Sequence, residues 1–253
     1  MSRMFSLLAI LAAFYVAICV AVWVFQRSLI YFPQPLAISH PSTLLRLVVD
    51  DGEVLVSVRP HAGPNALIYF GGNAEDVSLN LPEFAEVFPE HALYLMHYRG
   101  YGGSSGSPSE EAIQRDALAL FDWVHAMHPR TVVMGRSLGA AVAIRLASQR
   151  PASRLVMITP FDSLLAFAAR QFPYLPIKWL LKDKFESSTY AARIQVPTLL
   201  VVAEQDEIIS RASSEALYRH FAPGVAALKV IPGKGHNSIS ESPVYLELLR
   251  AAL

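Results

Sequence analysis

The sequence predicts an α/β domain built on a mostly parallel sheet and preceded by one hydrophobic helix. The first observation is a series of short apolar runs typical of buried strands, at 66–70, 92–98, 131–134, 154–158, 198–204 and 226–231. The second is that helical patterns separate these runs, near 76–87, 109–127, 138–149, 211–222 and 241–252. This alternation indicates parallel strands with helices on both faces of the sheet.

A hairpin precedes the alternating region. The segments LRLVVD and EVLVSVRP flank Asp51-Gly52, a dipeptide that favours a tight turn between antiparallel strands. We therefore expect two antiparallel strands followed by about six parallel ones. Ligands bind such sheets at the carboxyl ends of the strands, so the residues just after each strand are candidates for a functional site.

The N-terminal segment has the composition of a membrane anchor. Residues 5–25 carry no charge, and Arg3 and Arg27 stand outside the two ends. As a helix this run would reach about 31 Å, close to the hydrocarbon thickness of a bilayer. The alternatives are a buried core helix and a cleaved signal peptide, but a signal peptide ends in small residues and this run ends in Trp23, Val24 and Phe25.

The predicted organisation is an anchor at 1–27, a linker at 28–43 that contains Pro33, Pro35 and Pro41, and one domain at 44–253. Basic residues flank both ends of the apolar run and do not decide its orientation. Because a lone N-terminal anchor commonly leaves its amino end inside, we expect a single-pass membrane protein whose domain is extracytoplasmic.

Composition excludes several functions. Lys and Arg together number 21, as do Asp and Glu, so no basic surface is expected for nucleic acid. The single cysteine, Cys19, allows neither a disulfide framework nor a thiolate metal cluster. The segment FGGNAED lacks the lysine and the spacing of a phosphate-binding loop. We therefore expect no cofactor, no metal and no nucleic-acid partner.

A serine between two glycines stands where a strand turns into a helix. Ser137 lies in GRSLG, directly after the predicted strand 131–134 and before an alanine-rich helix. Glycines at both flanking positions permit the tight turn that lifts a nucleophilic hydroxyl above the sheet, and the helix directs its positive end at the same place. The alternative is a structural glycine turn.

A serine hydroxyl needs a base and a group that orients the base. Asp206 and His236 follow the last two predicted strands and give the chain order serine, acid, histidine. Asp162 also follows a strand and is an alternative acid, although it could instead cap the helix that starts at Ser163. The neighbouring acids of Asp206, at 204 and 207, would require a shifted loop.

Acyl transfer also needs two backbone donors for the oxyanion. The amide of Leu138, next to the nucleophile, is one candidate. The other is the amide of Asn73, in the loop Gly71-Gly72-Asn73 after the strand 66–70; an ordinary Gly-Gly turn is the alternative. Arg136, beside the nucleophile, is expected to contact either a ligand or a neighbouring loop.

Several motifs together resemble a known superfamily. GRSLG, HYRGYGGSSGSPSE, FGGNAED and TPFDSL are similar to motifs of the α/β-hydrolase superfamily, in particular its membrane-anchored, serine-aminopeptidase-like branch. The resemblance implies an eight-stranded sheet, a triad on Ser137, Asp206 and His236, and an oxyanion loop at Gly72-Asn73. Many members have histidine where this chain has Gly71, and aspartate where it has His97, which leaves the exact oxyanion donor open. We count Gly71 and Arg136 as candidate substrate-binding residues.

The segment 161–196 occupies the usual place of a lid. It is rich in large apolar side chains, which could line an acyl pocket, lie against the bilayer, or simply pack on the sheet. Arg99, in YRGYG, is either a substrate contact or half of a structural ion pair. We therefore predict a membrane-tethered serine hydrolase that cleaves a carboxylic ester or thioester of a small-molecule or lipid-like acyl substrate and contacts membrane lipid. The alternative is a catalytically silent binding module of the same fold.

Overall fold

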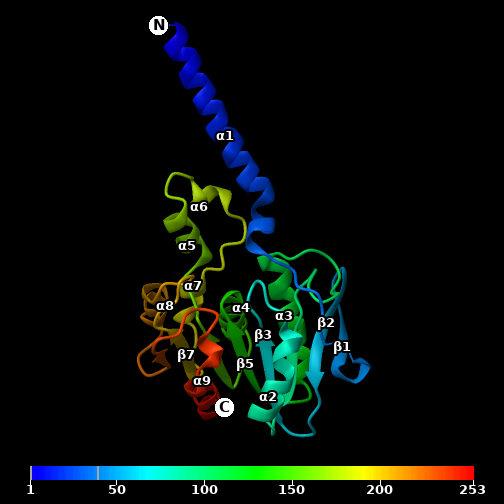
Figure 1. The fold of residues 1–253 in the computed structure, drawn as a ribbon. Helices are drawn as coiled ribbons and strands as arrows, with labels where there is room; N and C mark the ends of the chain where they lie inside the picture. The colour runs from blue at the N-terminus through cyan, green and yellow to red at the C-terminus, as the bar shows by residue number, and fades with distance from the viewer. Residues whose placement is uncertain (1, 39) are drawn as a thin grey trace.

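The computed structural model describes residues 2–38 and 40–253. Met1 and Ser39, which belong to the predicted anchor and linker, lie outside the described residues. Helix α1, Ser2–Ile30, projects away from the rest of the molecule (Figure 1). It continues three residues into the segment predicted as linker, because Ser28, Leu29 and Ile30 are not helix breakers and the first proline comes only at position 33.

The domain is built on one eight-stranded sheet in the order β1-β2-β4-β3-β5-β6-β7-β8. The strands are β1 (Leu44–Val49), β2 (Gly52–Arg59), β3 (Asn65–Phe70), β4 (Ala92–Met96), β5 (Arg130–Arg136), β6 (Arg154–Ile158), β7 (Thr198–Ala203) and β8 (Ala226–Ile231). β2 is antiparallel to both β1 and β4, and the pairs from β4 to β8 are parallel. Only one of the two predicted hairpin strands, β2, therefore runs against the rest.

Helices cover both faces of this sheet, as the solid apolar strands predict. On β3, Ile68 and Phe70 point into one apolar cluster, whereas Leu67 and Tyr69 point into another. The first cluster packs under α3 (Glu110–His125), α4 (Leu138–Ala147), α7 (Ser187–Ala191) and α8 (Arg211–Tyr218). The second packs under α2 (Leu81–Val87), which follows the short helix η2 (Val77–Asn80), and α9 (Pro243–Ala252), which follows η3 (Ile239–Glu241).

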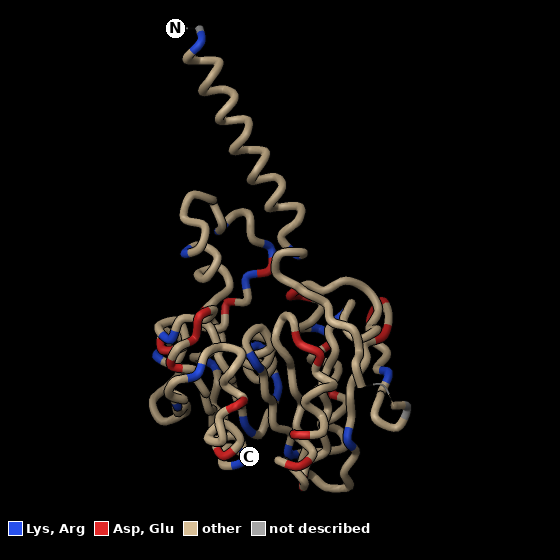
Figure 2. Tube along the Cα trace, viewed as in Figure 1, with Lys and Arg blue, Asp and Glu red and all other residues tan. Residues whose placement is uncertain are grey.

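The lid segment divides into two parts. α7 packs on the sheet and contributes the buried Ala191 to the core. α5 (Leu164–Gln171) has no buried residue, and α6 (Ile177–Leu180) has only Ile177. These two helices stand above the sheet next to the base of α1 (Figure 1), and the segment that they form, 164–180, contains basic but no acidic residues (Figure 2). Packing on the sheet therefore explains α7 but not α5 and α6.

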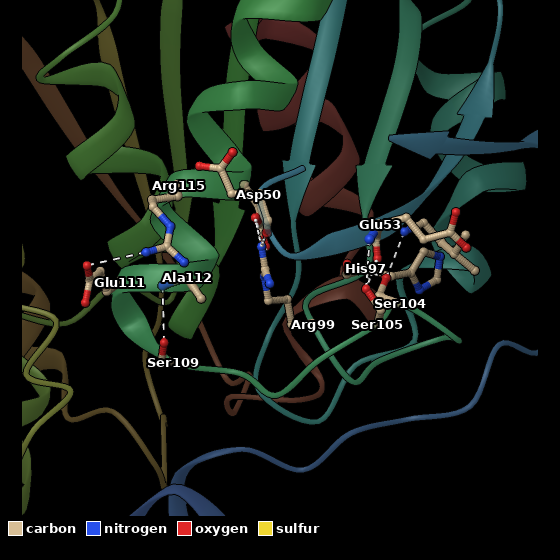
Figure 3. Close-up of polar contacts among 12 residues, drawn as sticks. Asp50, Glu53, His97, Arg99, Ser104, Ser105, Ser109, Glu111, Ala112 and Arg115 are labelled. Atoms are coloured by element: carbon tan, nitrogen blue, oxygen red, sulfur yellow. Dashed lines mark hydrogen bonds and ion pairs between the residues drawn. The ribbon is translucent and has the colours of Figure 1, made fainter. Parts of the chain in front are cut away.

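The loop after β4 is held by polar contacts within the domain (Figure 3). Arg99 forms a two-point ion pair with Asp116 at 2.7 and 2.8 Å, and it also donates to the Asp50 carbonyl at 2.5 Å. Both charged side chains are buried. Arg99 is thus half of a structural ion pair that closes the loop, the second of the two roles considered for it.

His97, at the start of the same loop, is a buried neutral base. Its Nε2 lies 2.9 Å from the Ser57 hydroxyl, and its Nδ1 lies 4.0 Å from Asp76. Burial lowers the pKa of His97 to about 4, and the Asp76 carboxylate offsets only part of this shift. His97 therefore brings no charge to this loop at neutral pH, whereas the aspartate that the family resemblance implies would bring a negative one.

This depressed pKa makes the stability of the domain dependent on pH. Below about 6.5 an unfolded histidine takes up a proton that folded His97 does not, so stability is complete above that pH and falls as the pH approaches 4. We expect wild type to lose about 2.5 kcal/mol more of its unfolding free energy between pH 7.5 and 4.5 than His97→Asn does. Chemical denaturation in detergent at the two pH values measures this difference, and equal losses would contradict it.

Candidate active site

Ser137 stands at a strained turn between β5 and α4. Its backbone has φ 52° and ψ −114°. Residues other than glycine rarely adopt this conformation, and when they do it is typically at a functional site. The flanking glycines are sterically required. A Cβ on Gly135 would lie 2.1 Å from the Gly139 carbonyl oxygen, and one on Gly139 would lie 2.0 Å from the Phe70 carbonyl oxygen. The turn can therefore form only with glycine at positions 135 and 139.

Ser137, His236 and Asp206 lie together at the carboxyl edge of the sheet. The Nε2 atom of His236 is 3.2 Å from the Ser137 hydroxyl, and its Nδ1 is 2.8 Å from Asp206 Oδ2. The Asp206 and His236 side chains are almost completely buried, with 1% and 6% of their surfaces exposed. Asp206 Oδ1 also accepts from the amides of Ile208 and Ile209, at 2.9 and 2.6 Å, which fixes the carboxylate in place. This arrangement can move a proton from the serine to the histidine.

The loop that carries His236 is held from two sides. Glu207 accepts from the His236 amide at 3.0 Å, and this hydrogen bond lowers the pKa of the Glu207 carboxyl. Arg136 donates to the His236 carbonyl at 3.2 Å and to Asn237 Oδ1 at 3.3 Å. Of the two contacts expected for Arg136, the structure contains the one with a neighbouring loop. Glu207, considered only as an alternative acid, instead positions the base.

The other alternative acids are engaged elsewhere. Asp162 accepts from the Ser213 hydroxyl at 2.5 Å and pairs with Arg170 at 3.4 Å. The predicted capping role of Asp162 is wrong as well, because Ser163 itself caps α5 by accepting from the Ala166 amide. Glu204 accepts from the Gly233 amide at 2.8 Å. Among these acids only Asp206 contacts the imidazole of His236.

Two backbone amides remain available to an oxyanion beside Ser137. Leu138 is the first residue of α4, so its amide has no partner within the helix. In the described part of the chain, no group accepts from the Asn73 amide, and Asn73 lines the same cavity as Ser137. The prediction that Gly72 is an oxyanion donor is wrong, because the Gly72 amide already donates to Glu75 at 2.7 Å. Gly72 instead lines the cavity beside Ser137, and a Cβ on it would come closest to the Glu75 carboxylate, at 3.3 Å.

Glu75 organises this loop and was not expected from the sequence. Its carboxylate accepts from the Tyr69 hydroxyl at 2.7 Å and from Asn80 at 2.6 Å, in addition to Gly72. It also lies 3.6 Å from Arg136, so that it joins the oxyanion loop to the turn at the nucleophile. The acidic residue in FGGNAED could have drawn attention, but only the fold brings it beneath Gly72.

Gly71 supports the loop and does not line the cavity beside Ser137. Its carbonyl accepts from the Tyr98 hydroxyl at 2.7 Å, and a Cβ on Gly71 would lie 2.5 Å from Val77. The expectation that Gly71 binds substrate is therefore not met, because the residue is buried behind Gly72.

An apolar cavity of about 390 Å³ opens beside the Ser137 hydroxyl, a size typical of small-molecule sites. Its walls come from the oxyanion loop, the nucleophile turn, the histidine loop, the lid and the end of α1. The lid contributes Phe161, Leu164, Phe167, Ala168, Phe172, Ile177 and Leu181, and α1 contributes Val22, Gln26, Leu29 and Ile30. The part played by α1 was not expected, because the sequence presents the anchor and the domain as separate segments.

The end of α1 also holds the oxyanion loop. The Asn73 side chain donates to the Ile30 carbonyl at 2.9 Å, and the Asn73 carbonyl accepts from the Phe32 amide at 3.1 Å. The Tyr101 hydroxyl donates to the same carbonyl at 2.6 Å. The Asn73 amide is thereby fixed by the segment that leaves the hydrophobic helix.

The strand order, the strained serine turn and the imidazole beside it define an α/β hydrolase. A family model described as serine hydrolase (FSH1) matches residues 93–236. An uncharacterised protein of Mycobacterium tuberculosis is 35% identical, with 99% of this chain and 95% of that protein covered. The chain therefore belongs to the FSH1 serine hydrolase family within the α/β-hydrolase superfamily, and it is a serine hydrolase.

A further relative and a solved structure are also similar to the chain. Protein bem46 of Schizosaccharomyces pombe is 28% identical, with 81% of this chain and 72% of that protein covered. A solved structure of an esterase from Pyrococcus furiosus superposes with a TM-score of 0.68 at 19% identity, covering 87% of this chain and 92% of the esterase. Because the chain belongs to a serine hydrolase family, the enzyme interpretation replaces the catalytically silent module.

The steric requirement at the serine turn can be measured with two glycine variants. Gly139→Ala drives a methyl group into backbone atoms and should lower the free energy of unfolding by at least about 3 kcal/mol. Gly224→Ala is the control without a clash, because no atom lies within 4 Å of a Cβ placed on Gly224; unlike Gly139, this residue has positive φ, so only backbone strain is added. It should cost only about 1–2 kcal/mol. Chemical denaturation of the two variants measures both values, and equal destabilisation would contradict the steric explanation.

Proposed function

We propose that this serine hydrolase is tethered to a membrane by α1 and cleaves a carboxylic ester or thioester through an acyl-enzyme on Ser137. The observation that carries the proposal is the hydrogen-bonded path from Asp206 to the His236 imidazole, and from there to the Ser137 hydroxyl at 3.2 Å. The apolar cavity beside that hydroxyl supports an acyl group as the part of the substrate that is bound.

In the acylation step, the Ser137 oxygen attacks the carbonyl carbon while His236 Nε2 takes the hydroxyl proton. The amides of Leu138 and Asn73 stabilise the negative charge on the carbonyl oxygen. The bond to the leaving alkoxide or thiolate then breaks, and His236 returns its proton to that group. Asp206, hydrogen-bonded to Nδ1, holds the imidazole in the correct tautomer and stabilises its charged form.

In the deacylation step, His236 takes a proton from a water molecule, whose oxygen attacks the acyl carbon. Collapse of the second tetrahedral intermediate breaks the bond to the Ser137 oxygen, which regains its proton from His236. The products are a carboxylic acid and an alcohol or thiol. The residues named here, together with one water molecule, account for every bond and proton in this cycle.

The membrane part of the proposal rests on the length and surface of α1. Among the described residues, Arg3–Ile30 is the one helix long and apolar enough to span a bilayer, and none of its apolar span is buried in the domain. A soluble core helix would be buried, which favours an anchor.

We place the catalytic domain on the extracytoplasmic side. Protease added to intact cells should then degrade the domain, and full protection would reverse this orientation.

Substitution of Ser137, His236, Asp206 and the control residue Asp162 tests the role proposed for each catalytic side chain. Fluorophosphonate labelling and ester turnover should be abolished in Ser137→Ala and reduced by roughly 10⁴-fold or more in His236→Ala. Asp206→Asn should lower turnover by about 10⁴-fold, because the imidazole loses its orienting carboxylate. Asp162→Asn, the matched control, should change turnover little, because Asp162 contacts Ser213 and not His236. Normal turnover by Ser137→Ala would disprove the assignment.

A further inference from the structure

The base of α1 is built into the lid and does not hang from the domain as a flexible tether. The Gln26 side chain donates to the Leu180 carbonyl at 3.0 Å and accepts from the Lys182 amide at 2.6 Å. Arg27 and the buried hydroxyl of Tyr31 both bind Asp183, at 3.0 and 3.1 Å. The end of the lid is therefore fixed against the last turns of the helix.

The tip of the lid runs along α1 toward the membrane. The Tyr15 hydroxyl donates to the Tyr174 carbonyl at 2.9 Å, and Lys182 stacks on the Trp23 ring at 3.7 Å. Tyr15 lies eight residues from Trp23, or about 12 Å along the helix axis. If Trp23 lies at the membrane interface, as tryptophans near the ends of spanning helices do, the lid tip extends past it into the same leaflet.

The surface of the lid tip suits such a position. Tyr174 is 89% exposed, Trp179 is 80% exposed and Phe172 is 54% exposed, a cluster of exposed aromatic side chains beside an apolar helix. Between residues 163 and 185 there are four basic residues and one acidic residue, and that acid, Asp183, is paired with Arg27. Basic side chains at this height can reach anionic lipid headgroups while aromatic rings enter the apolar region.

Several backbone groups at the lid tip have no need of water as a hydrogen-bond partner. Backbone groups without partners are costly in a bilayer. Pro173 and Pro176 have no amide hydrogen to satisfy, the Leu175 amide donates to the Phe172 carbonyl at 3.1 Å, and the Tyr174 carbonyl is bonded to Tyr15.

We propose that α5, α6 and α1 form a lateral entrance through which the acyl chain of a membrane lipid ester passes from the bilayer to Ser137. The lining of the cavity beside Ser137 includes Val22 and Leu29 of α1 and Phe172 and Ile177 of the lid. Because both pairs of residues belong to the segments beside the bilayer, the substrate enters without crossing water. This inference rests on the proposed hydrolase activity and adds the substrate class and its route.

The position of the lid is tested with a probe placed at its tip. In full-length Cys19→Ala protein, Tyr174→Cys carries a polarity-sensitive fluorophore, and Val48→Cys, also highly exposed but on the β1–β2 hairpin, is the matched control. In vesicles of phosphatidylcholine and phosphatidylglycerol, the probe at 174 should be quenched by acyl-chain spin labels and shielded at least fivefold from iodide. The probe at 48 should show the reverse. Equal quenching by iodide at the two positions would overturn the proposal.

The route is tested with two valines of the same helix. Val22 lines the cavity, whereas Val24 is 52% exposed and is not part of its wall. The substrates are a fluorogenic palmitate ester dissolved in the vesicles and the matching acetate ester in water. Val22→Trp should lower the palmitate-to-acetate ratio of kcat/KM at least tenfold, and Val24→Trp should leave it within twofold of wild type. If Val22→Trp does not fold, Leu29→Trp on the same wall should give the same loss.

Labelling of Ser137 by a small fluorophosphonate separates failure of the route from failure of the activity. If wild type and both variants are labelled but share one palmitate-to-acetate ratio, the lateral entrance is wrong and the hydrolase proposal stands. If wild type is not labelled and turns over neither ester, the hydrolase proposal fails and the route fails with it. Turnover of an S-palmitoyl peptide without turnover of the lipid ester would also overturn the assigned substrate.

Discussion

The chemistry of this protein depends on the turn at Ser137, which is too tight for any residue but glycine at positions 135 and 139. The serine backbone adopts positive φ, and the neighbouring carbonyls of β3 and α4 approach the positions where a Cβ would stand. That conformation places the hydroxyl above the sheet and the first amide of α4 beside it. The strain is maintained by the strands on both sides, which are buried in the centre of the sheet.

A second constraint connects the catalytic edge to the hydrophobic helix. Asn73 is fixed by Ile30 and Phe32, and Gln26 and Arg27 are fixed by the end of the lid. The oxyanion loop and the cavity wall therefore share one support, which is the base of α1. A segment that sequence patterns identify only as an anchor thus also belongs to the active site. Removal of α1 would therefore take away one wall of the cavity and the support of the Asn73 loop.

The sequence predicted those features that depend on local patterns. Solid apolar runs placed the strands, and GRSLG together with the order of Asp206 and His236 selected the side chains that the structure brings together. Features that depend on tertiary contacts were missed or misplaced. The Gly72 amide is taken by Glu75, and α1 becomes a cavity wall, because both depend on segments that meet only in the folded chain. The spacing of apolar and polar residues along the chain predicts neither of these two contacts.

The most direct measurement is to locate the acyl group during turnover. Full-length protein in vesicles is mixed with a palmitate ester, quenched within one turnover and digested, and the peptides are analysed by mass spectrometry. A palmitoyl group on Ser137 that forms and decays at the rate of turnover is the expected result. Steady turnover with the acyl group on another residue, or with no acylated peptide at any time, would contradict a nucleophilic role for Ser137.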